Sequence, residues 1–275
     1  MNRMTRRFQE LRRTGRKALI PYIAAGDPHP DQTVPMLHTL VQAGADIIEL
    51  GVPFSDPMAD GPIIQKACER ALAQGMSLRR VLELVRAFRR SDMETPLVLM
   101  GYLNPIESMG YDAFVADASE AGVDGVLTVD LPPEEAPELA ERLIAADIDP
   151  IFLLAPTSSI ERVRRAAELA RGYLYYVSLK GVTGSAALNV AEVTEKLAMI
   201  RTCTDLPLGV GFGIKDPLTA AAIAQVADAV VIGSALVSRM AEWADDPERM
   251  RREVGAWLSA IRQAMSVASG ERAVL

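Results

Sequence analysis

Residues 207–235 read PLGVGFGIKDPLTAAAIAQVADAVVIGSA and contain one complete unit of a pattern that repeats along the chain. A short apolar run at 207–211 is followed by a helix-length segment at 216–226 and by a second apolar run at 228–233. Short apolar runs bounded by glycine or proline are typical of buried strands. The unit therefore predicts two parallel strands joined by a crossover helix.

The same pattern extends from this unit toward both ends of the chain. Strict alternation of strands and helices requires parallel strands with right-handed crossovers, and eight such units close naturally into a barrel. Eight strand candidates occur, at 18–24, 45–51, 96–101, 123–129, 148–154, 173–178, 207–211 and 228–233. Helix-like segments lie at 31–43, 77–90, 111–121, 134–146, 159–170, 189–201 and 216–226, with room for an additional short helix in 62–90 and for a closing helix at 247–268.

An open, doubly wound sheet is the competing architecture. It usually carries GxGxxG after its first strand, whereas the first strand here runs into AGDP at 25–28. No linker rich in Ser, Gly or Pro divides the chain, and Met4, Phe8 and Leu11 recur at helical spacing before the first strand. We therefore expect an α/β fold, a single-domain (β/α)8 TIM barrel over residues 1–275 with an additional N-terminal helix.

The composition is that of an ordinary globular protein, with 49% hydrophobic residues, 24% charged residues and a formal net charge of −7. The acidic balance argues against a nucleic-acid partner, and no apolar run approaches the ~20 residues that span a bilayer. The basic start, 1–17, lacks the apolar core of a signal peptide, so we expect a cytoplasmic protein, with a targeting segment as the weaker alternative. Cys68 and Cys203 form no CxxC motif and only His29 and His38 are histidines, so neither a disulfide framework nor a metal site is expected.

In a β/α barrel the active site forms where strands end and the following loops begin. The second strand candidate continues as ADIIELGVPFSDPMADGP at 45–62, which places Glu49 among apolar neighbours and Asp56 and Asp60 in the next loop. A carboxyl group in apolar surroundings has a raised pKa, which suits acid–base work at neutral pH. The alternatives are a salt-bridged glutamate at the barrel mouth and an aspartate that caps a turn or helix before Pro62.

The last two strand candidates end in GVGFG at 209–213 and IGSA at 232–235. Glycine lets backbone N–H groups approach an anion, and a following helix N-terminus adds its dipole. Because no Lys or Arg lies within either strand end, we expect backbone amides to hold the phosphate of a small phosphorylated metabolite. The loop at 180–185 suits either a lid or a phosphate contact, and the tyrosine-rich run at 173–178 is most simply core.

Longer motifs resemble one family closely, over essentially the whole chain. The segment ELGVPFSDPMADGPIIQ at 49–65 is similar to the tryptophan synthase α-subunit family and is its most specific match. Further matches are PYIAAGDP (21–28), GYLNP (101–105), GVDGVLTVDLPPEE (122–135), APTSS (155–159), YYVSLKGVTG (175–184), VGFGIKDP (210–217) and ADAVVIGSALV (227–237). The resemblance implies retro-aldol cleavage of indole-3-glycerol phosphate to indole and glyceraldehyde 3-phosphate in L-tryptophan biosynthesis.

The resemblance also assigns site residues, position by position. It implies catalytic roles for Glu49 and Asp60, with Glu49 protonating indole C3 and then accepting the glycerol hydroxyl proton while ionised Asp60 stabilises the ring nitrogen. Tyr22 replaces a phenylalanine common in the family, and Leu179 and Lys180 depart from more polar lid residues. The implied substrate contacts are Tyr22, Met100, Leu127, Tyr175, Thr183, Phe212 and Ile232, and the implied phosphate contacts are Gly184, Gly213, Gly233 and Ser234.

A partner is implied as well. Family members bind a pyridoxal-phosphate-dependent β subunit in an α2β2 heterotetramer and pass indole to it, so no cofactor is expected in this chain. The matching docking surface is the barrel mouth, at Pro53, Asp56, Asn104 and Pro132. Two other functions compete: a sugar-phosphate isomerase or epimerase on the same kind of barrel, and a catalytically idle barrel that only regulates a partner.

Overall fold

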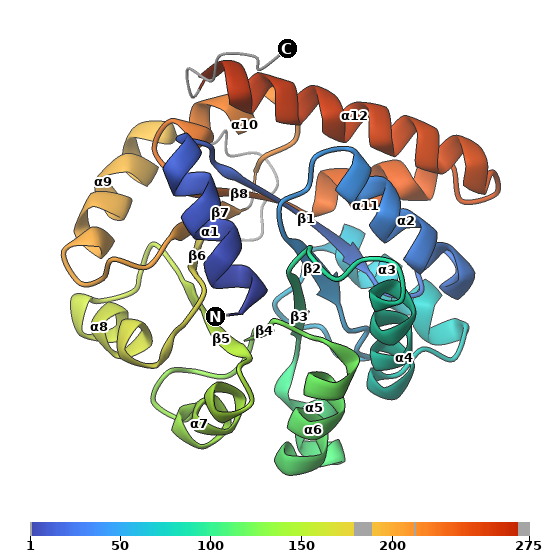
Figure 1. Ribbon diagram of the computed structural model, residues 1–275, viewed down its shortest axis with the longest axis horizontal. Coiled ribbons are helices and arrows are strands. Elements are labelled where there is room, and N and C mark those ends of the chain that lie inside the picture. Colours follow the sequence, from blue (N-terminus) through green and yellow to red (C-terminus); the bar gives the residue numbers. More distant parts are fainter. Residues whose placement is uncertain (1, 179–188, 212, 269–275) are drawn as a thin grey trace.

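The computed structural model describes residues 2–178, 189–211 and 213–268. Eight parallel strands form one closed barrel in the order β1 to β8, with helices around the outside (Figure 1). This confirms the predicted β/α barrel. The strands are β1 (Ala18–Ala24), β2 (Ile48–Gly51), β3 (Leu97–Gly101), β4 (Gly125–Thr128), β5 (Asp149–Leu154), β6 (Leu174–Val177), β7 (Leu208–Gly211) and β8 (Ala229–Ile232).

The helices follow the predicted alternation with three differences. The interval 62–90 holds two helices of 12 residues each, so the prediction of one helix and a short additional one was wrong. Helix α5 was not predicted, and for α11 only a helix start after the eighth strand was expected, without bounds. The helices are α1 (Arg3–Thr14), α2 (Pro30–Gln42), α3 (Pro62–Ala73), α4 (Leu78–Arg89), α5 (Leu103–Met109), α6 (Tyr111–Ala121), α7 (Pro137–Ala145), α8 (Ile160–Leu169), α9 (Val190–Arg201), α10 (Pro217–Ala224), α11 (Ser234–Glu242) and α12 (Pro247–Ala268).

The barrel interior is filled by alternate strand residues, as a two-residue period requires. Ile47, Leu127 and Tyr173 belong to this buried inner cluster, and the predicted N-terminal helix α1 joins it through Met4 and Phe8. The Phe8 and Tyr173 rings lie 6.0 Å apart. Helix α1 therefore covers the end of the barrel where the strands begin (Figure 1), which leaves the other end open for a site.

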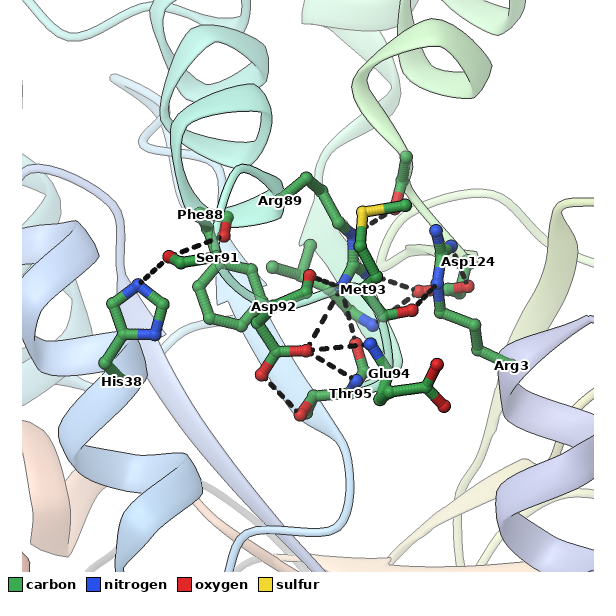
Figure 2. Close-up of polar contacts among 12 residues, drawn as sticks. Arg3, His38, Phe88, Arg89, Ser91, Asp92, Met93, Glu94, Thr95 and Asp124 are labelled. Atoms are coloured by element: carbon green, nitrogen blue, oxygen red, sulfur yellow. Dashed lines mark hydrogen bonds and ion pairs between the residues drawn. The ribbon is translucent and has the colours of Figure 1, made fainter.

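Buried aspartates tie neighbouring strands together at the covered end. Asp124, just before β4, accepts a hydrogen bond of 2.8 Å from the Leu97 backbone N–H at the start of β3. Figure 2 shows Arg89 of α4 and Arg3 of α1 donating to the same carboxylate, at 2.6 and 2.9 Å. Since these residues come from α1, α4, β3 and the residue just before β4, this group stabilises the barrel at the end far from the carboxyl ends of the strands. The same side-chain to backbone contact recurs between Asp46 and Leu19 and between Asp228 and Leu208.

Most strands are shorter than the apolar runs from which they were predicted. Residues at the ends of these runs make hydrogen bonds outside the strand ladder. The run at 45–51 becomes a strand only from Ile48, since Ala45 donates its N–H to the last turn of α2 and the Asp46 carboxylate bonds to β1. Within the described residues, no helix is both long and apolar enough to cross a membrane.

Candidate active site

A cavity of about 410 Å³ opens at the carboxyl ends of the strands. Its walls come from β1, β2, β3, β6 and β8, the loop after β2, the loop after β7, and α3 and α11. This is the end of the barrel where the sequence predicted the site. The predicted site residues that line the cavity are Tyr22, Glu49, Asp60, Met100, Tyr175, Gly213, Gly233 and Ser234.

Glu49 lies at the inner end of the cavity with its carboxyl group fully buried. The Tyr173 hydroxyl donates a hydrogen bond to its Oε1 atom, while its Oε2 atom has no hydrogen-bond partner among the described residues. Burial raises the pKa of Glu49 to about 8, and the bond from Tyr173 only partly opposes this rise. No ion pair to Glu49 occurs within the described part of the chain, so its environment is that of an acid rather than of a salt-bridged carboxylate.

Asp60 is held in the loop after β2 by a tyrosine that directly follows the next strand, β3. The Tyr102 hydroxyl donates to Asp60 Oδ2 at 3.0 Å and itself accepts the Ala59 N–H at 3.0 Å. Burial raises the pKa of Asp60 and the Tyr102 bond lowers it. Gly61, not Asp60, is the N-cap of α3 and makes no side-chain cap bond, so Asp60 does not serve as the helix cap. Tyr102 lies within the GYLNP motif, but nothing local in the sequence marks it as the partner of Asp60.

Two glycines make room for the tyrosines of the cavity wall. A Cβ atom on Gly51 would overlap the Tyr22 hydroxyl, and one on Gly211 would overlap the Tyr175 hydroxyl. Both glycines end a strand beside the one that carries its tyrosine, Gly51 on β2 beside β1 and Gly211 on β7 beside β6. The phenol rings therefore lie against bare backbone, next to Glu49, and both are almost completely buried.

The other end of the cavity has the features of an anion site. Gly213 adopts a φ of 75°, a conformation that favours glycine, and Gly233 and Ser234 form the start of α11. Two cationic side chains, Lys215 and Arg239, also line this cavity. Sequence reasoning missed both, because one follows β7 by four residues and the other lies inside α11, whose extent was not predicted.

Some predicted substrate contacts do not line the cavity. Leu127 is fully buried in the inner cluster below it. Ile232 does not line the cavity either: the alternation along β8 turns it outward into the layer beneath the helices, and Val231 lines the cavity. Three further predicted contacts, Thr183, Gly184 and Phe212, and the predicted lid residues Leu179 and Lys180 lie outside the described residues.

The predicted docking residues lie in the segments that follow β2, β3 and β4, at the same end of the barrel, with Asn104 in the first turn of α5. Asp56 and Asn104 are exposed and Pro132 is half-buried. Pro53 is buried, so the expectation that it forms part of an exposed partner surface was wrong. Met58, on the same loop as Asp56, is 86% exposed and was not predicted.

The histidines serve local structure. His29 accepts the Asp31 N–H at 3.3 Å at the start of α2, and His38 Nε2 lies 3.0 Å from the Ser91 hydroxyl (Figure 2). Across residues 2–178, 189–211 and 213–268, no three His, Cys, Asp or Glu side chains are grouped as metal ligands.

A closed β/α barrel with a buried carboxyl group of raised pKa at one end of its cavity and glycine-rich loops at the other defines a barrel enzyme of the acid–base class. The sequence model of the tryptophan synthase alpha chain family matches residues 8–266. The chain therefore belongs to the tryptophan synthase alpha chain family. It is a lyase that cleaves indole-3-glycerol phosphate to indole in tryptophan biosynthesis, and membership implies a β-subunit partner.

Individual relatives agree with this assignment. The tryptophan synthase alpha chain of Thioalkalivibrio sulfidiphilus is 63% identical, covering 96% of this chain and 100% of the relative. That of Methylococcus capsulatus is 62% identical, covering 96% and 99%. The crystal structure of tryptophan synthase subunit alpha from Legionella pneumophila str. Paris superposes with a TM-score of 0.92 at 47% identity, covering 97% of this chain and 99% of that one.

Proposed function

We propose that Glu49 is the acid–base residue of indole-3-glycerol phosphate cleavage and that Asp60 is its electrostatic partner. The observation that carries this proposal is the burial of Glu49, which raises its pKa to about 8 beside a cavity that Asp60 also lines. A carboxyl group with this pKa is mostly protonated at neutral pH, so it can donate a proton and then take one back.

The two proton transfers account for the bond that breaks. Protonated Glu49 adds its proton to indole C3, and the positive charge that develops at the ring nitrogen is stabilised by the Asp60 carboxylate. The Glu49 carboxylate then takes the proton from the hydroxyl on the carbon attached to C3. As that carbon becomes a carbonyl, the carbon–carbon bond breaks and its electron pair neutralises the ring cation. Indole and glyceraldehyde 3-phosphate result, and Glu49 is protonated again.

The substrate phosphate is proposed to lie at Gly213, Gly233 and Ser234. These residues line the same cavity as Glu49 and include the positive end of α11. Anchoring the phosphate there would use binding energy remote from the reacting carbons to orient C3 toward Glu49.

Glu49→Gln tests the central assignment. We expect normal folding and retained binding of indole and of glycerol 3-phosphate, with kcat lower by roughly 10²–10⁴-fold because one proton-transfer group is lost. The matched control is Glu94→Gln, at an exposed glutamate that pairs with Arg6 of α1, the helix covering the opposite end of the barrel. Turnover near that of the wild type in Glu49→Gln would refute the assignment.

We further propose that the chain forms an α2β2 heterotetramer through the barrel mouth, with Asp56, Met58, Asn104 and Pro132 in the contact. The pyridoxal phosphate would belong to the β subunit, and this chain would work without a cofactor, as one domain over residues 1–275 and in the cytoplasm. Exposed loops around the cavity opening support this surface. Titrating the cognate β chain while following mass and indole release tests it; no complex at micromolar concentration would contradict it.

A further inference from the structure

Both acidic and basic side chains line the cavity. Glu49 and Asp60 are its acidic groups at the end proposed for the indole ring, and Lys215 and Arg239 are its cationic groups at the end proposed for the phosphate. Glu242, on the last turn of α11, also lines the cavity. The proposed substrate carries a phosphate dianion, and the cavity that would bind it contains two full positive charges. Binding of the phosphate by backbone amides alone does not explain why these two cations are there.

One face of α11 forms the wall of the cavity from the helix N-terminus onward. Ser234, Ser238 and Glu242 are spaced four residues apart and share that face, with Arg239 adjacent to them. At about 1.5 Å per residue, the Arg239 Cα lies about 7.5 Å along the axis from that of Ser234. Side chains of a helix lean toward its N-terminus, so an arginine at this distance covers the turn next to the phosphate end.

Arg239 is supported by an aromatic ring and not by a carboxylate. Its guanidinium carbon lies 4.7 Å from the centroid of the Trp257 ring on α12, the helix packed against α11. Among the described residues the contact of the Arg239 guanidinium is this ring and not an ion pair, although Glu242 is only three residues further along the same helix. The tryptophan therefore restricts the guanidinium without neutralising its charge.

The magnitudes favour a role for this charge. A helix N-terminus supplies roughly half an elementary charge, whereas a phosphate monoester carries about 1.5 to 2 negative charges at neutral pH. The glycine loops and the start of α11 leave most of that charge unbalanced in a partly closed cavity. Lys215 and Arg239 supply the remainder, and of the two only Arg239 has an aromatic contact within the part of the chain that the structure describes.

We propose that Arg239, seated on Trp257, is a specificity-determining residue that recognises the negative charge of the substrate phosphate, with Lys215 as a second cation. The inference rests on the proposed phosphate position at Gly213, Gly233 and Ser234. The glycine loops and the start of α11 are proposed to fix the position of the phosphate, so Arg239 adds only a charge attraction that is equal in the ground state and the transition state. Its loss therefore raises KM and leaves kcat unchanged.

The experiment measures the binding of the two halves of the substrate separately, by calorimetry with glycerol 3-phosphate and with indole. We expect Arg239→Gln and Arg239→Met to weaken glycerol 3-phosphate about tenfold, the equivalent of about 1.4 kcal/mol, and to leave the affinity for indole unchanged. Arg239→Lys, which keeps the charge, should retain most of the affinity. In steady-state cleavage, the neutral variants should raise KM by the same factor at wild-type kcat.

The matched control is Arg249→Gln. Arg249 also stacks on a tryptophan, at 3.6 Å from the Trp243 ring centroid, but does not line the cavity. It should bind both ligands like the wild type. Unchanged affinity for glycerol 3-phosphate in either folded neutral variant, or equal weakening of indole, would overturn the role of Arg239. Failure of the phosphate position itself is distinguished by Gly213→Val: if that variant binds glycerol 3-phosphate normally, the proposed phosphate site is wrong.

Discussion

Glu49→Gln should change how the free energy of unfolding depends on pH. Burial raises the pKa of Glu49 from 4.5 to about 8 in the folded protein. Between these two values the folded protein retains a proton on Glu49 that the unfolded chain has released. Stability therefore falls as the pH rises through this window, by about 1.4 kcal/mol per pH unit.

The amide of the substituted side chain has no proton to release, so the variant lacks this contribution. The free energy of unfolding of the variant, relative to the wild type, should grow by about 2–3 kcal/mol between about pH 5.5 and about pH 7.5. Other groups titrate in both proteins and cancel in the difference. The Tyr173 hydroxyl, which now donates to Glu49 Oε1, can donate to the amide oxygen in the same way.

Urea unfolding followed by circular dichroism at the two pH values measures this difference. Glu94→Gln, at an exposed position, should show a difference from the wild type that does not depend on pH. Glu49→Gln, the variant expected to lose catalysis, should thus become more stable relative to the wild type as the pH rises toward neutral. A stability difference for Glu49→Gln that stays constant with pH would refute the claim that Glu49 is protonated in the folded state.

Three further predictions concern the supports of the site and the barrel. Tyr102→Phe removes a hydrogen bond that lowers the pKa of Asp60, so the acid limb of the kcat/KM profile, where ionised Asp60 is lost, should move to higher pH; an unmoved limb would contradict the pairing. Asp124→Ala leaves Arg89 buried without its carboxylate and should lower the free energy of unfolding by about 3–5 kcal/mol in urea titrations, with kcat per folded molecule unchanged. Gly51→Ala places a methyl group against the Tyr22 hydroxyl and should cost about 1–3 kcal/mol of stability and raise KM, and wild-type values of both would show that the ring can move aside.

The barrel could be predicted from the sequence because its signal is local. Apolar runs and helix-length segments alternate along the chain, and the first predicted strand, 18–24, coincides with β1. Helix α5 and the extent of α11 escaped prediction because they lack such a signal. Helix α5 is only seven residues long and contains Pro105, and α11 follows β8 after a single glycine, so the apolar residues of strand and helix merge into one run.

The sequence by itself also determined that Glu49 and Asp60 lie at one end of the barrel, because every parallel strand ends at the same rim. Only the tertiary structure determined the hydrogen-bond partners of these two carboxyl groups and the extent of their burial. Tyr173 is 124 residues from Glu49 and meets it only because the closed barrel places β6 across from β2. Packing determines in the same way the Tyr102 bond to Asp60 and the position of Arg239 on Trp257. Strand register determines that Val231, and not Ile232, lines the cavity. Burial by the whole barrel raises the pKa of Glu49, because desolvation is a property of the surroundings and not of the residue itself.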